Sequence, residues 1–181
     1  TLPGLPPVPP VSTLPIITIN DVSAVEGDGG LFDSTQGFFV FGGMANTTEF
    51  VSGNFNSDGI PDLVAVPFFT NAAPSVLLSN GAARSFSPGP VVPFSANGSF
   101  EVAVGDIDGD GDDDIVVLER ISNVITVLTN TDGQANFLVT STITGATGSE
   151  DIQLVDVDGV NGLDVVITND SIDSVQVYRN V

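Results

Sequence analysis

Short apolar runs closed by glycine, asparagine or aspartate recur along the chain from Phe32 onward. This pattern is typical of β-strands joined by tight turns. No segment has the spacing of apolar residues that marks an amphipathic helix. We therefore predict an all-β fold, in which the clearest strands are Val76–Leu78, Glu101–Gly105, Asp114–Leu118, Val124–Leu128, Phe137–Ile143 and Val175–Tyr178.

A nine-residue acidic loop occurs three times between these runs, at residues 54–62, 106–114 and 156–164. The three loops start 52 and then 50 residues apart. A regular period of this size indicates one supersecondary unit repeated in tandem. Asparagines close a strand at nearly the same interval, at positions Asn80, Asn130 and Asn180.

Residues 1–31 do not share the repeat pattern, and we predict that they form a separate N-terminal region. Residues 1–15 hold six of the twelve prolines, which favours an extended, polyproline-like conformation. The β-branched run Ile16–Ile19 predicts an isolated strand. This region is either a docking arm that carries a strand or a plain linker between domains.

The second loop offers oxygen atoms at the spacing that calcium requires. Calcium takes six to eight oxygen ligands, and a tight loop supplies them from alternate positions. Four carboxylates so close together would repel one another without a cation. We predict side-chain ligands at Asp106, Asp108, Asp110 and Asp114, with a backbone carbonyl from Asp112.

The other two loops keep this spacing with fewer charges. In the first loop we predict Asn54, Asn56, Asp58 and Asp62 as side-chain ligands and Ile60 as the carbonyl ligand, so its affinity should be lower. In the third loop Asp156, Asp158 and Asp164 remain, and either water or Asn161 would fill the fifth position. We therefore predict two Ca²⁺ sites, and the third loop is either another site or a solvated turn.

These motifs resemble the FG-GAP or VCBS repeat. The resemblance rests on the Asp-x-Asp-Gly-Asp-Gly-x-x-Asp loop, the apolar run after it and the strand end Val76-Leu77-Leu78-Ser79-Asn80-Gly81, and it extends over residues 32–181. It implies that each repeat is a four-stranded blade of a β-propeller, with calcium in the loop between its first two strands. The chain would then hold three propeller-like blades, from repeats at about 32–85, 86–136 and 137–181. The third loop departs from the pattern at Val160 and Gly162.

Composition excludes several classes of function. Three arginines stand against 23 acidic residues, for a net charge of -20, so neither nucleic acid nor an anionic membrane is an expected partner. No histidine or cysteine is present, which removes the common nucleophilic triads and histidine-ligated zinc. The remaining glutamates are scattered along the sequence, so we predict that the chain is not an enzyme; they are Glu26, Glu49, Glu101, Glu119 and Glu150.

The strand count suggests how the protein associates. The third repeat ends on its third strand, and Phe38–Phe41 could supply the missing outer strand to its own chain or to another. Exposed strand edges recruit partners. Calcium sites of this kind work at extracellular concentrations, and sequons at Asn46, Asn97 and Asn169 permit N-glycosylation.

We therefore predict an extracellular or cell-surface structural or adhesive subunit, stabilised by calcium, that self-assembles into a polymer or filament through its N-terminal strand. The alternative is a ligand- or carbohydrate-binding module of a larger secreted enzyme or adhesin. A surface glycan or a protein would then be its ligand.

Overall fold

The computed structural model describes residues 47–67, 73–81, 86–94 and 100–181. The chain divides into two units, residues 1–38 and 39–181, and every described residue belongs to the second. The predicted N-terminal domain (1–31), its strand Ile16–Ile19 and the outer strand Phe38–Phe41 lie outside the described residues.

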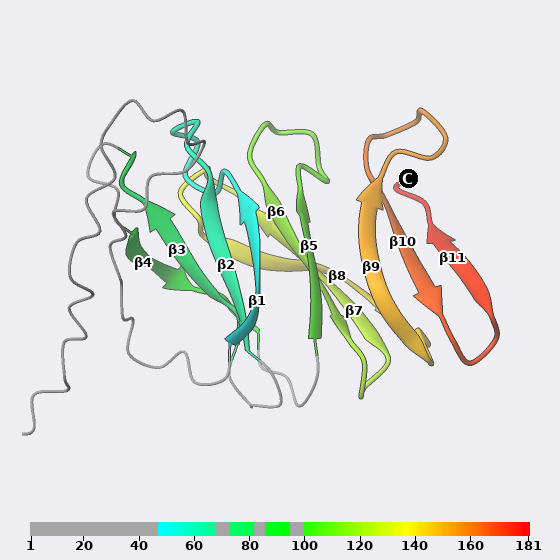
Figure 1. The fold of residues 1–181 in the computed structure, drawn as a ribbon. Helices are drawn as coiled ribbons and strands as arrows, with labels where there is room; N and C mark the ends of the chain where they lie inside the picture. Colours follow the sequence, from blue (N-terminus) through cyan, green and yellow to red (C-terminus); the bar gives the residue numbers. More distant parts are fainter. Residues whose placement is uncertain (1–46, 68–72, 82–85, 95–99) are drawn as a thin grey trace, which may run out of the picture. The chain divides into compact units, whose positions relative to one another are not determined.

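The described elements are all β-strands, and they form three antiparallel sheets (Figure 1). This confirms the all-β prediction. Sheet 1 contains β1 (Thr47–Gly53), β2 (Asp62–Pro67), β3 (Ser75–Ser79) and β4 (Phe86–Val91). Sheet 2 contains β5 (Phe100–Gly105), β6 (Asp114–Glu119), β7 (Val124–Asn130) and β8 (Phe137–Thr144). Sheet 3 contains β9 (Ser149–Val155), β10 (Asp164–Asn169) and β11 (Ser174–Tyr178).

Within each sheet the strands lie in chain order, and the acidic loop joins the first strand to the second. The sheets are offset from the predicted repeats, because β4 and β8 open the second and third repeats but complete sheets 1 and 2. Sheet 3 has three strands in the described part of the chain. This agrees with the prediction that the third repeat ends on its third strand, and the outer strand predicted to complete it, Phe38–Phe41, lies outside the described residues.

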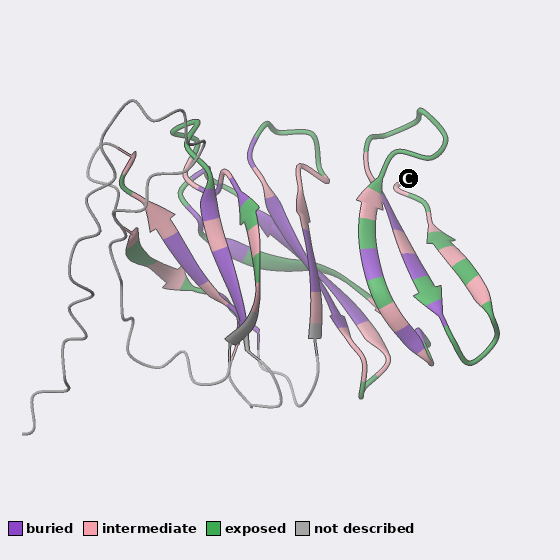
Figure 2. Cartoon of the chain, in the orientation of Figure 1, coloured by how far each residue is buried: buried purple, intermediate pink, exposed green. Residues whose placement is uncertain are grey.

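Sheet 2 lies between the other two sheets, and its strand β6 is buried on both faces (Figure 2). Side chains on a strand alternate between faces. Ile115 and Val117 therefore share a core with residues of sheet 1, while Val116 and Leu118 share a second core with residues of sheet 3. The two cores hold the three acidic loops at the same end of successive sheets.

Candidate metal centres

The three acidic loops share one backbone conformation at their fourth and sixth positions. Both positions have positive φ in every loop, a region that glycine and asparagine adopt more readily than other residues. In the third loop, where the second glycine is displaced to Gly162, Asn161 adopts the left-handed conformation instead. The residues concerned are Ser57 and Gly59, Gly109 and Gly111, and Gly159 and Asn161.

The last aspartate of each loop ties the loop to the end of the third strand of its sheet. Asp62, Asp114 and Asp164 are fully buried. Each Oδ2 accepts a hydrogen bond from the second residue of its loop, at 3.0, 2.8 and 3.0 Å. Each Oδ1 accepts one from the backbone N–H of Ser79, Asn130 or Asn180, at 2.7, 2.8 and 2.8 Å. These aspartates are therefore structural residues as well as predicted ligands.

The electrostatics of the second and third loops differ. Burial raises the pKa of Asp114 to about 6, although backbone N–H donors, chiefly those of Asn130 and Ile107, oppose the shift. Burial, followed by the charge of Asp110, raises the pKa of Asp112 to about 6 as well. In contrast, the N–H groups of Asn180 and Val157 lower the pKa of Asp164. A positive charge in the second loop would therefore favour the ionised forms of Asp112 and Asp114.

Two of the loops gather carboxylates closely enough to hold a metal ion. Oxygen atoms of Asp106, Asp108 and Asp114 lie within 4.8 Å of one another, and so do those of Asp156, Asp158 and Asp164. Two oxygens bound to one calcium at about 2.4 Å can be at most about 4.8 Å apart, so both groups fit that ion. The structure thus brings together three of the four predicted side-chain ligands of the second loop and all three of the third.

The remaining predicted ligands make local contacts in and beside their loops. Asp110 accepts a hydrogen bond from the Asp112 N–H at 3.2 Å, while the Asp112 side chain is buried with its Oδ1 unpaired. Asn161 donates to the Asn180 carbonyl at 3.4 Å. In the first loop, Asn54 Oδ1 accepts from Gly59, Asn56 Oδ1 accepts from Asp58, and Asp58 Oδ1 accepts from Ile60.

Contacts between sheets involve residues whose role the sequence did not reveal. Asn130 Nδ2 in sheet 2 donates to the Phe55 carbonyl in the first loop at 2.7 Å. Asn180 Nδ2, after β11, donates to the Ile107 carbonyl in the second loop at 2.6 Å. Asp113 Oδ2 accepts from the Asn54 N–H at 2.7 Å. The spacing of the asparagines was the available signal, and the structure shows that Asn130 and Asn180 each tie their sheet to the loop of the sheet before it.

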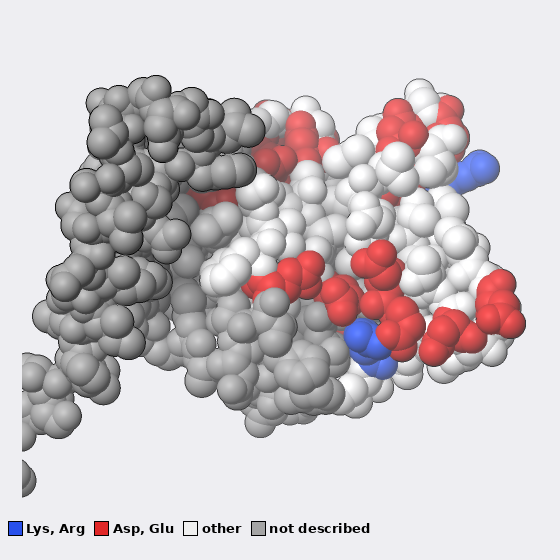
Figure 3. Space-filling view, viewed as in Figure 1, with Lys and Arg blue, Asp and Glu red and all other residues white. Residues whose placement is uncertain are grey.

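A second acidic group crosses the first strands of the three sheets. Glu49, Glu101 and Asp151 repeat at the loop intervals, on β1, β5 and β9. Burial, followed by the charge of Glu49, raises the pKa of Glu101. Arg120 bridges Glu101 at 3.5 Å and also pairs with Glu150, and Figure 3 shows acidic side chains grouped beside basic atoms on this face. The description of Glu49, Glu101 and Glu150 as scattered is therefore wrong, because register across the sheets brings them together.

The sequon asparagine in the described part of the chain is engaged in the fold. Asn169 is buried, and its Nδ2 donates to the Thr147 carbonyl at 2.5 Å while its Oδ1 accepts from Ser171 at 3.1 Å. The folded chain therefore does not offer this amide nitrogen to a modifying enzyme. Asn46 and Asn97 lie outside the described residues.

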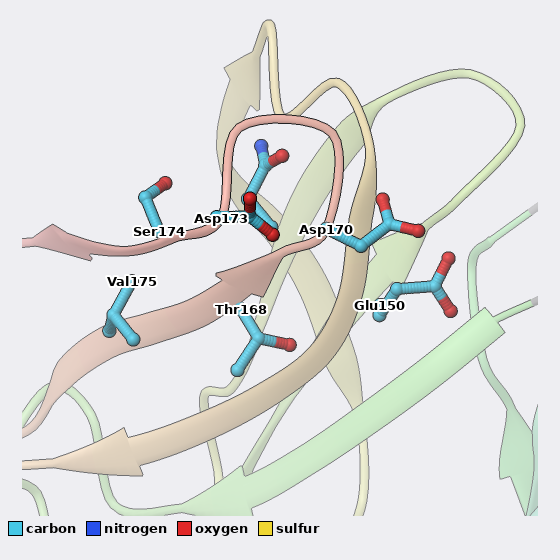
Figure 4. Close-up of a pocket in the computed structure, with 7 residues that line it drawn as sticks. Glu150, Thr168, Asp170, Asp173, Ser174 and Val175 are labelled. Atoms are coloured by element: carbon cyan, nitrogen blue, oxygen red, sulfur yellow. The ribbon is translucent and has the colours of Figure 1, made fainter.

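A shallow hollow of about 310 Å³ lies at the turn between β10 and β11 (Figure 4). Polar residues make up most of the residues around it, and three of them are carboxylates. The residues lining the hollow are Glu150, Thr168, Asn169, Asp170, Asp173, Ser174 and Val175.

No helix long and apolar enough to cross a membrane occurs in residues that the structure describes.

Comparison with known proteins identifies the repeat. A family model described as an FG-GAP-like repeat matches residues 54–117, which run from the first acidic loop through the second and into β6. The match covers about a third of the chain. No curated protein matches the chain. The chain therefore contains an FG-GAP-like repeat, which confirms the resemblance seen in the sequence.

Proposed function

We propose that this protein is an extracellular repeat subunit with a structural or adhesive role, stabilised by calcium and able to self-associate. The observation that carries the proposal is the shared loop design, in which one buried aspartate closes each acidic loop and ties it to the third strand of the sheet. The FG-GAP-like match supports a repeat module, and the resemblance implies calcium binding outside the cell.

Calcium would be held by Asp106, Asp108 and Asp114 in the second loop and by Asp156, Asp158 and Asp164 in the third. Bound there, the ion would neutralise clustered carboxylates and hold the first hairpin of each sheet. Extracellular calcium modules have dissociation constants of roughly 0.1 to 1 mM. With a Kd of about 0.1 mM, about 1 mM calcium stabilises the fold by about 1.4 kcal/mol per site.

The free edge of sheet 3 supports self-association. In sheets 1 and 2 the third strand pairs with a fourth, whereas β11 has no such neighbour in the described part of the chain. An exposed strand edge accepts an added strand through backbone hydrogen bonds. The donor in this proposal is the predicted strand Ile16–Ile19 of another copy, carried on the proline-rich arm.

A ligand-binding module of a larger secreted protein is the second candidate. The hollow beside the β10–β11 turn favours it, because Glu150, Asp170 and Asp173 could accept hydrogen bonds from sugar hydroxyls. Both candidates are non-enzymatic, in line with the absence of histidine and cysteine.

Electron microscopy of the purified full chain, in millimolar calcium and after chelation, tests the main proposal. We expect ordered fibres that fray when calcium is removed, and their loss in a chain lacking residues 1–20. Isolated particles under both conditions, together with measurable glycan affinity, would instead favour the binding module. Fibres unchanged by the deletion would refute pairing through the N-terminal strand.

A further inference from the structure

Asp112 is a buried carboxylate that the described part of the chain leaves without a counter-charge. The residue is 8% exposed, and its Oδ1 atom has no hydrogen-bond partner. The arginines among the described residues, Arg120 and Arg179, pair with other carboxylates. A buried charge is costly unless it is paired or bound to a metal ion. Asp112 therefore requires a partner that these residues do not supply.

The Asp112 side chain points toward the first loop and the turn between β7 and β8. A Cβ atom added to Gly133 in that turn would lie 2.8 Å from Asp112 Oδ2 and 2.5 Å from the Oγ of Ser57 in the first loop. The two oxygens therefore converge on one point beside Gly133. Gly133 is buried and has a φ of 59°, so a side chain there is disfavoured by space and by conformation. Glycine at this position lets oxygens from two different loops approach each other.

Hydrogen bonds beside this point fix the first and second loops to each other. Asp113 Oδ2 accepts from the Asn54 N–H at 2.7 Å, and the Asp113 N–H donates to the Asn54 carbonyl at 3.2 Å. In the β7–β8 turn, the Ala135 N–H donates to the Phe55 carbonyl at 2.7 Å. The place where the oxygens meet is therefore built by contacts that do not require a cation.

Asp110 supplies a second carboxylate near Asp112. The group of carboxylates close enough to share one ion in this loop consists of Asp106, Asp108 and Asp114, and it does not include Asp110. Asp110 Oδ1 accepts from the Asp112 N–H at 3.2 Å. After burial, the charge of Asp110 is the largest influence that raises the pKa of Asp112. The two carboxylates are therefore close together, and a cation between them would relieve both.

We propose that a second calcium ion binds between the carboxylates of Asp110 and Asp112, with Ser57 Oγ of the first loop as a third ligand. This ion is separate from the one assigned to the Asp106 group, and it uses the Asp112 side chain and not its carbonyl. Calcium prefers carboxylate and hydroxyl oxygens and takes six to eight ligands, so water would complete its coordination. The ion would join the first loop to the second, and thereby sheet 1 to sheet 2.

A proton shared between Asp110 and Asp112 is the competing explanation. It would neutralise one of the two carboxylates, whereas a divalent cation neutralises both and also engages Ser57. For that reason we favour the cation. The inference rests on the calcium binding in the proposed function, and it adds a site and a link between sheets that the proposed function does not require.

Equilibrium dialysis with radioactive calcium at neutral pH tests the site in the full chain, because it counts the ions bound at saturation. Asp112→Asn keeps the shape and the backbone carbonyl of the residue and removes the carboxylate. We expect this variant to bind one ion fewer per chain than the natural protein, with the dissociation constants of the remaining ions unchanged. The matched control is Asp173→Asn, in the β10–β11 turn, which removes the same charge from an exposed residue and should leave the count unchanged.

Ser57→Asp gives a second test of opposite sign, because it places a third carboxylate beside Asp112. Ser57 is exposed and has a φ of 56°, a conformation that aspartate accepts better than most residues. Calcium affinity depends on the number of charged ligands, so the dissociation constant of the added ion should fall by about tenfold. The melting temperature should then rise in millimolar calcium and fall in chelator, where the new carboxylate repels Asp112.

An unchanged ion count in Asp112→Asn would overturn the inference. If the count is unchanged and one existing ion binds more weakly, Asp112 serves the ion of the Asp106 group and the separate site is refuted. Equal destabilisation of Ser57→Asp in calcium and in chelator would also refute the site and would indicate a shared proton. These outcomes are separable from the proposed function, because a natural chain that binds no calcium at all would refute the calcium binding of both.

Discussion

Replacing the second residue of each acidic loop by alanine should lower the stability of the fold by amounts that differ among the three repeats. Phe55 is fully buried beneath sheet 2 and packs edge-on against Phe137 with ring centroids 5.7 Å apart. Ile107 is half-buried, and Val157 is 49% exposed. The three side chains occupy the same position in loops of similar backbone, so differences in cost report the covering sheet and the size of the side chain, and not the loop.

The magnitudes follow from these burial states. A fully buried phenylalanine typically costs 3–5 kcal/mol when it is replaced by alanine, so we expect about 4 kcal/mol for Phe55→Ala. Ile107 is only half-buried and has a smaller side chain than phenylalanine, so we expect Ile107→Ala to cost about 1.5 kcal/mol. For Val157→Ala we expect less than about 0.5 kcal/mol, as for an ordinary surface change.

Urea unfolding followed by far-ultraviolet circular dichroism measures these differences, in millimolar calcium and at sub-micromolar protein so that association does not contribute. Equal slopes with urea concentration in all variants would show that the midpoints can be compared. A cost for Val157→Ala close to that for Phe55→Ala would refute the reasoning, because the position would then serve its own loop and not the junction with the next sheet.

Three further predictions concern the locks and the charges. Asn130→Asp keeps the side-chain shape but replaces the donor to the Phe55 carbonyl with a buried acceptor. Thermal and urea unfolding should therefore show a loss of stability of roughly 3–5 kcal/mol. A loss below about 1 kcal/mol would contradict the role of this hydrogen bond in joining the two sheets. Asp110→Asn removes the charge of a predicted ligand but no tie to a strand, so the melting temperature should not fall in chelator and should rise less on calcium addition than in the natural chain. Glu101→Gln should stabilise the fold by about 0.5 kcal/mol at pH 7, because burial and a neighbouring glutamate disfavour the carboxylate. The raised pKa of Glu101 means that this penalty exists above the folded-state pKa and disappears as pH falls through it, so the two proteins should converge near pH 4; a constant difference would contradict the assignment.

Local patterns predicted the strands and the acidic loops because both depend on neighbouring residues. Alternation and turn residues placed the six clearest strands to within about two residues of their observed ends, as comparison of Val124–Leu128 with β7 illustrates. The period of about 50 residues predicted the repetition for the same reason. The strand count also indicated that the third repeat lacks its own outer strand, whereas the register in which β4 pairs with β3 and β8 pairs with β7 is a nonlocal choice that local patterns do not fix.

The contacts between sheets were hidden for a related reason. Glu49 and Glu101 are 52 residues apart, and only the packing of β1 beside β5 makes them neighbours. The asparagine spacing was visible, but an asparagine at a strand end is equally suited to a turn. Its donation to the loop of the preceding sheet depends on how the sheets pack. The structural role of Asp114 was obscured because a carboxylate at that position also satisfies the spacing of a metal ligand.

That double role explains why calcium and folding should be coupled most strongly in the second loop. Asp114 must remain ionised to ligate a cation, yet burial raises its pKa, and the neighbouring carboxylates add repulsion. Asp164 accepts the same pair of backbone hydrogen bonds, but those bonds outweigh burial and lower its pKa. The third loop can therefore hold its strand tie with a charged aspartate and no cation, whereas the second loop gains more from one. Sheet 2 packs against both other sheets, so calcium bound in its loop would stabilise the element on which both junctions depend.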